Sequence, residues 1–231
     1  MIAHDSWAKV YDRAYQESFG SFYKKLTDLT LSVIQEETSK DFKIVDFGAG
    51  TGRLSCPLSE LGYEMTAVDS SSEMLRELIK KDINKRINIH NAPMQNFTTL
   101  EKYDLALCVF SVLIYLIDEE SLNRALSSLQ ECLKLNGLVL MDIPSSLAFR
   151  DFKYESSTLC RNVIIDKKND IYTYNESIDV YEGDNWINYN DKFEIRCWSS
   201  ETILHKMKQL GFKVKKDLSM RFAGSGASYF L

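Results

Sequence analysis

Three closely spaced glycines with a carboxylate before and after them form the segment best suited to bind a ligand. Gly48, Gly50 and Gly52 follow the apolar residues 43–47. Glycine permits positive φ angles and lets a ligand approach the backbone closely. A helix is expected to begin directly afterwards, and the first turn of a helix offers unpaired N–H groups. The pattern of strand, glycine loop and helix predicts a binding site for a nucleoside-type ligand.

The two carboxylates indicate which ligand this loop receives. Asp69 ends the second expected strand, where it can accept both ribose hydroxyls of an adenosine ligand or, alternatively, cap the next helix. Asp46 precedes the glycines, where it would repel a pyrophosphate but pair with a cationic amino or sulfonium group. The spacing G-x-G-x-G also departs from the dinucleotide pattern G-x-G-x-x-G. An NAD-dependent dehydrogenase is therefore the weaker alternative.

Four segments resemble the motifs of class I S-adenosylmethionine-dependent methyltransferases. Residues 45–52 read VDFGAGTG, residues 67–75 read AVDSSSEML, residues 133–140 read LKLNGLVL and residues 7–12 read WAKVYD. Their order and spacing resemble the small-molecule branch of this family, which includes amine and amino-sugar N-methyltransferases. The resemblance implies S-adenosylmethionine as cofactor, S-adenosylhomocysteine as product, and a Rossmann-like fold.

The resemblance also implies which residues hold the cofactor. They are Asp46, Gly48, Ala49, Gly50, Gly52, Arg53, Asp69, Ser70, Met74, Pro93, Met94, Gln95, Phe110 and Ser111. One feature departs from the family, because residues 91–97 lack the acidic residue that commonly contacts the adenine amino group. Adenine recognition is then expected from backbone groups, Met94 or Gln95. Residues 110–116 resemble the family's loop between cofactor and acceptor, although a plain core-facing turn is the alternative.

The elements expected around these motifs alternate between strand and helix. Short apolar runs predict strands, and apolar residues at helical spacing between capping residues predict helices. Expected strands are residues 43–47, 64–69, 87–90, 103–109, 138–143, 212–219 and 227–231, and expected helices are residues 5–15, 21–38, 53–62, 71–83, 118–135 and 199–211. This order predicts an α/β fold with a seven-stranded, mostly parallel sheet and helices on both faces.

Residues 159–198 differ in composition and hydrophobic pattern from the rest of the chain. They alternate apolar and polar residues between turn-forming clusters, which predicts three antiparallel strands inserted after strand five as a lid. We therefore divide the chain into a cofactor-binding core with N-terminal helices (1–158), the lid (159–198) and a C-terminal helix with the last two strands (199–231). The lid aromatics fit ordinary sheet packing or an acceptor pocket; they are Tyr172, Tyr174, Tyr181, Trp186, Tyr189 and Trp198.

The acceptor is expected at the carboxyl ends of the strands, beneath the N-terminal helices. Methyl transfer from a sulfonium needs mainly positioning and desolvation. Tyr11 and Tyr115 are the expected catalytic positioning residues, and acceptor binding is expected from Tyr11, Tyr15, Tyr115 and Arg196. Arg196 fits an anionic acceptor group or a surface ion pair equally well. No dominant base is evident, and the three histidines, His4, His90 and His205, are expected to be structural or exposed.

Composition argues against some classes of partner but does not identify the methyl acceptor. The net charge of −5 argues against nucleic acid, and the five cysteines match no zinc spacing, so we expect free thiols and no metal. No signal peptide is evident, and residues 105–117 are too short to span a membrane, so a cytoplasmic protein is expected. The expected activity is N- or O-methylation of a small polar metabolite. A tRNA wobble-base methyltransferase and a non-catalytic cofactor-binding protein stay open, as does a homodimer.

Overall fold

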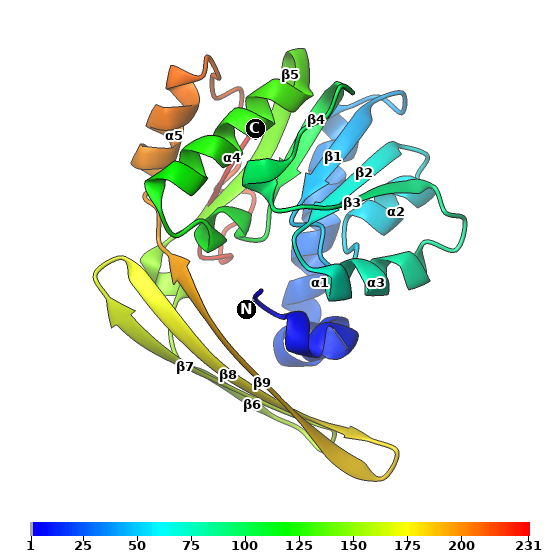
Figure 1. The fold of residues 1–231 in the computed structure, drawn as a ribbon, viewed down its shortest axis with the longest axis vertical. Coiled ribbons are helices and arrows are strands. Elements are labelled where there is room, and N and C mark those ends of the chain that lie inside the picture. Colours follow the sequence, from blue (N-terminus) through cyan, green and yellow to red (C-terminus); the bar gives the residue numbers. More distant parts are fainter. Residues whose placement is uncertain (1) are drawn as a thin grey trace.

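Two sheets of different character organise the computed structural model, which describes residues 2–231 (Figure 1). The larger sheet has the strand order β10-β5-β4-β1-β2-β3, and all neighbouring strands are parallel except β10, which is antiparallel to β5. Its strands are β1 (Lys43–Phe47), β2 (Glu64–Asp69), β3 (Ile87–Asn91), β4 (Tyr103–Cys108), β5 (Leu133–Pro144) and β10 (Ala227–Phe230). The strand order reverses direction between β1 and β4, which is where doubly wound sheets bind ligands.

Helices cover both faces of this sheet. They are α1 (Tyr11–Glu37), α2 (Ser55–Glu60), α3 (Ser72–Lys81), α4 (Glu119–Cys132) and α5 (Ser200–Gln209), and short 3₁₀ turns are η1 (Asp5–Val10), η2 (Met94–Asn96), η3 (Val112–Tyr115) and η4 (Ser146–Ala148). Leu122 of α4 and Ile203 of α5 share one core, whereas Val33 of α1, Leu58 of α2 and Leu78 of α3 share the other. Among residues 2–231, no helix combines the length and apolar character that crossing a membrane requires.

The predicted α/β fold is confirmed, but the larger sheet has six strands rather than seven. Residues 212–219 form no strand, although an isolated bridge pairs Asp217 with Phe230 of β10 and the Leu218 N–H donates to the Tyr229 carbonyl at 2.8 Å. The carboxylate of Asp217 accepts the N–H of Ser219, which turns the chain locally. Side chains that bond their own backbone compete with sheet pairing. This turn interrupts regular pairing with β10 at residues 217–219.

The smaller sheet is antiparallel and is called the lid sheet below. It contains β6 (Phe152–Glu155), β7 (Leu159–Lys168), β8 (Ile171–Glu182) and β9 (Asn185–Arg196). The hairpin turns use residues that tolerate positive φ, with Asn169 at 59° and Asp184 at 69°. The three long strands occur where the sequence predicts them. The four-residue strand β6 was not predicted, because so short a run carries little periodicity.

The N-terminal segment, residues 2–20, lies between the core and the lid sheet (Figure 1). Gly20 interrupts α1 with φ 51° and ψ −131°, so the first part of the helix takes a different direction from the remainder. Trp7 and Val10 pack with the lid residues Leu159 and Ile178 in a separate apolar cluster. The segment thus belongs to the packing of the lid sheet as well as to that of the core.

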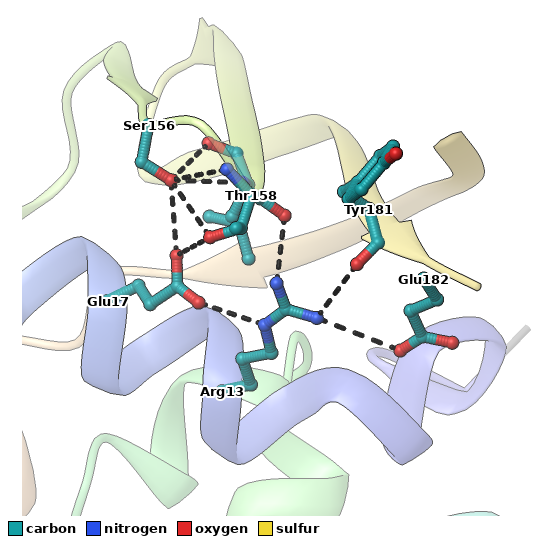
Figure 2. Close-up of polar contacts among 7 residues, drawn as sticks. Arg13, Glu17, Ser156, Thr158, Tyr181 and Glu182 are labelled. Carbon is teal, nitrogen blue, oxygen red and sulfur yellow. Dashed lines mark hydrogen bonds and ion pairs between the residues drawn. The ribbon is translucent and has the colours of Figure 1, made fainter. Parts of the chain in front are cut away.

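A polar cluster ties helix α1 to the lid sheet (Figure 2). The Arg13 guanidinium donates to the Thr158 carbonyl at 3.0 Å and to the Glu17 carboxylate at 2.9 Å. It also donates to the Tyr181 carbonyl at 3.4 Å. Glu17 accepts in turn from the Thr158 hydroxyl at 3.1 Å and from Ser156 at 3.2 Å. One arginine therefore satisfies backbone carbonyls at both β7 and β8.

Replacing Arg13 with methionine should loosen the lid sheet from α1. Methionine keeps an apolar stem but removes the donors, so the variant should lose about 1–2 kcal/mol of unfolding free energy, since the guanidinium is partly exposed. Hydrogen exchange should accelerate in β7 and β8, while affinity for S-adenosylmethionine stays within about twofold. The same change at the exposed Arg150 is the control. Unchanged exchange in both strands would show that Arg13 does not hold them.

Candidate functional site

The glycine loop lies at the carboxyl end of β1 and is fastened to β2. The N–H of Gly48 donates to the Val68 carbonyl at 2.8 Å. A Cβ on Gly48 would lie 2.6 Å from Val112 of η3, and one on Gly52 would lie 2.8 Å from Leu78 of α3. Both glycines also have positive φ angles. They are therefore required because the loop after β4 and helix α3 approach the backbone closely.

Asp69, the last residue of β2, faces this loop. One carboxylate oxygen accepts the N–H of Gly50 at 2.8 Å and the other accepts the N–H of Ser71 at 2.8 Å. Burial raises the pKa of Asp69, and these two backbone bonds oppose that effect. Each carboxylate oxygen can accept a further hydrogen bond. Asp69 is thus held in one orientation with acceptor capacity left for two hydroxyl groups.

A cavity of about 670 Å³ opens beside this carboxylate. That volume lies within the range of small-molecule and cofactor pockets. Predicted cofactor residues line one end of it, namely Gly48, Gly50, Asp69, Ser70, Met74, Pro93, Met94, Gln95 and Phe110. The methionines and the proline give this end an apolar wall next to the polar loop. The structure therefore brings together nine of the residues that the sequence assigns to the cofactor.

The opposite end of the cavity is made by the N-terminal segment, η3 and the lid sheet. Tyr11 and Tyr115 line it, as the sequence predicts for the acceptor side. Residues not predicted there are Ile2, Ala3, His4, Ile117, Thr173, Lys192, Phe193 and Glu194, whereas Val112 belongs to the loop of residues 110–116 that the sequence places between cofactor and acceptor. The sequence could not reveal the unpredicted residues, because their contribution depends on how the N-terminal segment and the strands β8 and β9 pack over the core. His4 was expected to be structural or exposed.

Asp46 and Arg53 lie outside the residues that line the cavity. Asp46 is buried behind the loop and accepts the Ser55 hydroxyl at 2.6 Å. Burial raises its pKa to about 7, and the Ser55 bond opposes that effect. The Arg53 guanidinium lies over the rings of Tyr23 and Phe110. Its Nε and Nη2 atoms are buried and find no hydrogen-bond partner among residues 2–231.

The loop after β4 is held in a strained conformation. Phe110 and Ser111 have consecutive positive φ angles of 71° and 64°, each of which costs on the order of 1–3 kcal/mol. The buried Asp142 of β5 accepts the Ser111 N–H at 2.8 Å. Burial raises the pKa of Asp142 to about 6, and the bonds from Ser111 oppose that effect. Ser111 thus fixes the loop from behind, while Phe110 faces the cavity.

The remaining predicted site residues contact other parts of the protein. Ala49 donates its N–H to the Val68 carbonyl, and Gly52 packs against α3. Tyr15 stacks on Tyr11 within the cluster of the N-terminal segment. Arg196 donates to the Asp170 carboxylate at 2.7 Å, so the structure places it in an ion pair rather than on the cavity wall.

A second cavity, of about 370 Å³, lies between α5, β5 and the C-terminal segment. Its described lining is mainly apolar, with lysines 208, 213 and 215 as the charged residues. It lies away from the carboxyl ends of β1 and β2 and includes none of the predicted cofactor or acceptor residues. The larger cavity is therefore the candidate site.

Comparison with known proteins agrees with placing the site at the glycine loop and Asp69. A family model described as a methyltransferase domain matches residues 44–137, which contain the glycine loop and Asp69. Two relatives are named putative methyltransferases. The one from Geobacillus sp. is 30% identical over 63% of this chain and 59% of its own length. The one from Bacillus subtilis, YqeM, is 24% identical over 87% of each chain. A glycine/sarcosine N-methyltransferase of Aphanothece halophytica is 26% identical over 60% of this chain and 51% of its own.

Solved structures show the same fold. An S-adenosylmethionine-dependent methyltransferase from Clostridium acetobutylicum superposes with a TM-score of 0.84 at 20% identity, covering 96% of both chains. The sugar N-methyltransferase KedS8 from Streptoalloteichus superposes with a TM-score of 0.76 at 18% identity, covering 96% of this chain and 92% of that one. Because nearly the whole chain is covered in both, the similarity includes the lid sheet as well as the core.

Proposed function

We propose that the chain is a class I S-adenosylmethionine-dependent methyltransferase and that it methylates a nitrogen or oxygen of a small polar metabolite; the methyltransferase-domain match and the similar proteins described above support this. The observation that carries the proposal is one cavity with two different ends. Gly50 and Asp69 lie at one end, and Tyr115, Lys192 and Glu194 lie at the other. A donor and an acceptor bound at the two ends would meet between the glycine loop and the lid sheet.

The residues of the glycine-loop end fit S-adenosylmethionine. Asp69 would accept the ribose hydroxyls, since its carboxylate is oriented and has acceptor capacity left. Met74, Pro93 and Met94 would pack on the adenine. The unpartnered N–H groups of Arg53, beneath Phe110, are suited to the donor's carboxylate after a small shift of that ring.

S-adenosylmethionine supplies a methyl group on a sulfonium, which is a good leaving group. The contribution of this chain is then to orient the acceptor and to exclude water. The N-terminal segment and the lid sheet enclose the acceptor end, with Tyr11, Tyr115 and Phe193 among the lining residues. Displacement needs a lone pair on the acceptor, so an amine must be neutral when it reacts.

The walls of the acceptor end favour an amino sugar or an amino acid derivative. Lys192 and Glu194 are exposed neighbours on β9 and carry opposite charges, so they can receive both an anionic and a cationic group. Thr173 of β8 adds a hydroxyl. Relatives named for sugar N-methylation and for glycine/sarcosine N-methylation support this class.

The proposal is tested by incubating the protein with methyl-labelled S-adenosylmethionine and two separate fractions, a small-metabolite pool and total tRNA. We expect label in a small amine or alcohol and none in tRNA. The Asp69→Ala variant should transfer far less label under the same conditions. Labelled tRNA would overturn the proposed acceptor class, and the absence of label in both fractions would favour a protein that binds the cofactor without catalysis.

A further inference from the structure

His4 lies at the boundary between the cavity and the lid sheet. The side chain is buried, with 8% of the residue exposed, yet it contributes to the cavity lining. The rings of Trp7, Tyr11, Tyr115 and Phe193 surround it edge-on, with centroids 4.8–5.9 Å from the imidazole. The backbone N–H of this residue donates to an Asp191 carboxylate oxygen. The imidazole is therefore fixed in position from several sides.

Its two ring nitrogens meet different chemical groups. Nδ1 lies 3.8 Å from a carboxylate oxygen of Glu176, which itself accepts from Arg161 at 2.6 Å. Nδ1 has no hydrogen-bond partner among residues 2–231. A carboxylate cannot donate, so the electrostatically favoured arrangement places the imidazole proton on Nδ1. Nε2 is then left as a bare acceptor.

Nε2 lies 2.8 Å from the Tyr115 hydroxyl. Since the bare nitrogen accepts, Tyr115 donates its only proton to His4. Tyr115 lines the cavity, and its hydroxyl oxygen keeps acceptor capacity after donating its proton. A tyrosine whose proton is committed in this way can only accept hydrogen bonds from a ligand.

His4 stays neutral in these surroundings. Burial, together with the smaller effect of the Arg161 charge, lowers its pKa to about 3. Glu176 and Asp191 are the carboxylates that face it, and Tyr11 and Tyr115 are the nearby phenols. The hydrogen bond from Tyr115 is therefore expected to persist throughout the range of pH in which the enzyme works.

We propose that His4 is a positioning residue that makes Tyr115 a hydrogen-bond acceptor for an N–H group of the methyl acceptor. The inference rests on the proposed function and narrows its substrate class. Holding the nitrogen through its own N–H leaves the lone pair free to attack the donor. A primary or secondary amine satisfies this requirement, whereas a neutral tertiary amine has no N–H to donate. Methylation should therefore stop when the nitrogen carries no hydrogen.

Nitrogen NMR of protein labelled with ¹⁵N-histidine tests the pairing without any acceptor. The His4 signals are assigned by their loss in His4→Gln. We expect the neutral Nδ1–H tautomer between pH 5 and 8, with an Nε2 shift that moves toward the free-nitrogen value in Tyr115→Phe. Tyr174→Phe is the matched control, because Tyr174 stacks on Phe193 beside the same imidazole. An imidazolium or an Nε2–H tautomer in the wild type would overturn the proposal.

The second measurement uses sarcosine and N,N-dimethylglycine as probe amines. Sarcosine should be methylated and N,N-dimethylglycine should not. His4→Phe and Tyr115→Phe should each raise KM for sarcosine by roughly 3- to 10-fold with unchanged donor affinity, and the double variant should add little. His4→Gln should raise KM less than His4→Phe does, because the glutamine amide oxygen can also accept a hydrogen bond from Tyr115. Additive effects, or turnover of N,N-dimethylglycine, would contradict the inference. If sarcosine is not methylated at all, the proposed acceptor class is weakened and the NMR result alone decides the pairing.

Discussion

Replacing Asp69 with alanine is expected to reduce the affinity for S-adenosylmethionine by roughly 10- to 150-fold, or about 1.5–3 kcal/mol. The variant removes the carboxylate proposed to accept the ribose hydroxyls. It also leaves the N–H groups of Gly50 and Ser71 without their present acceptors, so the glycine loop loses part of its support. Isothermal titration calorimetry with S-adenosylmethionine measures the change directly.

Asp82 offers a matched control for this experiment. It also accepts two backbone N–H groups, those of Arg86 and Ile87, but it follows helix α3 and contributes nothing to the described cavity lining. Asp82→Ala should leave donor affinity within about twofold. It should lower the free energy of unfolding about as much as Asp69→Ala does, since each variant loses two hydrogen bonds from backbone N–H groups. Equal losses of affinity in the two variants would indicate a general effect on folding rather than a ribose contact.

Replacing Asp46 with asparagine is expected to stabilise the protein at alkaline pH. The pKa of the buried carboxyl is about 7 in the folded protein, against 3.8 for an exposed group. The folded state therefore holds this proton more tightly, and the stability it contributes is lost as pH rises from about 4 through about 7. The full loss corresponds to about 4 kcal/mol as an upper bound. Asparagine does not titrate, and its carbonyl can still accept the Ser55 hydroxyl.

Denaturant unfolding at pH 5 and pH 8 measures this effect. The free-energy difference between Asp46→Asn and the wild type should be larger at pH 8. Asp184→Asn, in the exposed turn between β8 and β9, should show no such dependence. A difference that is equal at both pH values would refute the burial argument. Calorimetry on the same variant tests separately whether Asp46 pairs with the donor, as the sequence suggests.

The glycine-loop end of the site was accessible to sequence reasoning because its residues are close together in the chain. Strands β1 and β2 begin and end where their apolar runs do, and Ser71, Asp118 and Ser199 cap the helices that follow them. Parallel neighbours necessarily bring their carboxyl ends together, so Asp69 could be placed beside the glycine loop. The local residue pattern and the topology of a parallel sheet were sufficient to predict the glycine-loop end of the site.

Apart from Tyr11 and Tyr115, the residues of the acceptor end could not be predicted, because that end depends on contacts between distant segments. His4 meets Tyr115 across 111 positions, and its backbone meets Asp191 across 187. Hydrophobic periodicity in a sequence gives no indication of contacts between residues so far apart in the chain. From the sequence Arg196 fitted an acceptor contact or an ion pair equally well, and the structure places it in an ion pair with Asp170. Asp142 was also missed, because a carboxylate in an apolar strand gives no sign that it supports a loop.

The polypeptide chain passes between the core and the lid sheet at two places, residues 145–151 before the sheet and residues 197–199 after it. The hairpin turns of the lid sheet, at residues 169–170 and 183–184, lie outside the strands β1, β2 and β4 that position the glycine loop. If the lid sheet contacts the acceptor as proposed, changes in this sheet would alter the choice of acceptor while the residues proposed to bind the donor stay the same. The same separation makes the lid sheet the natural unit to exchange when such an enzyme is retargeted by engineering.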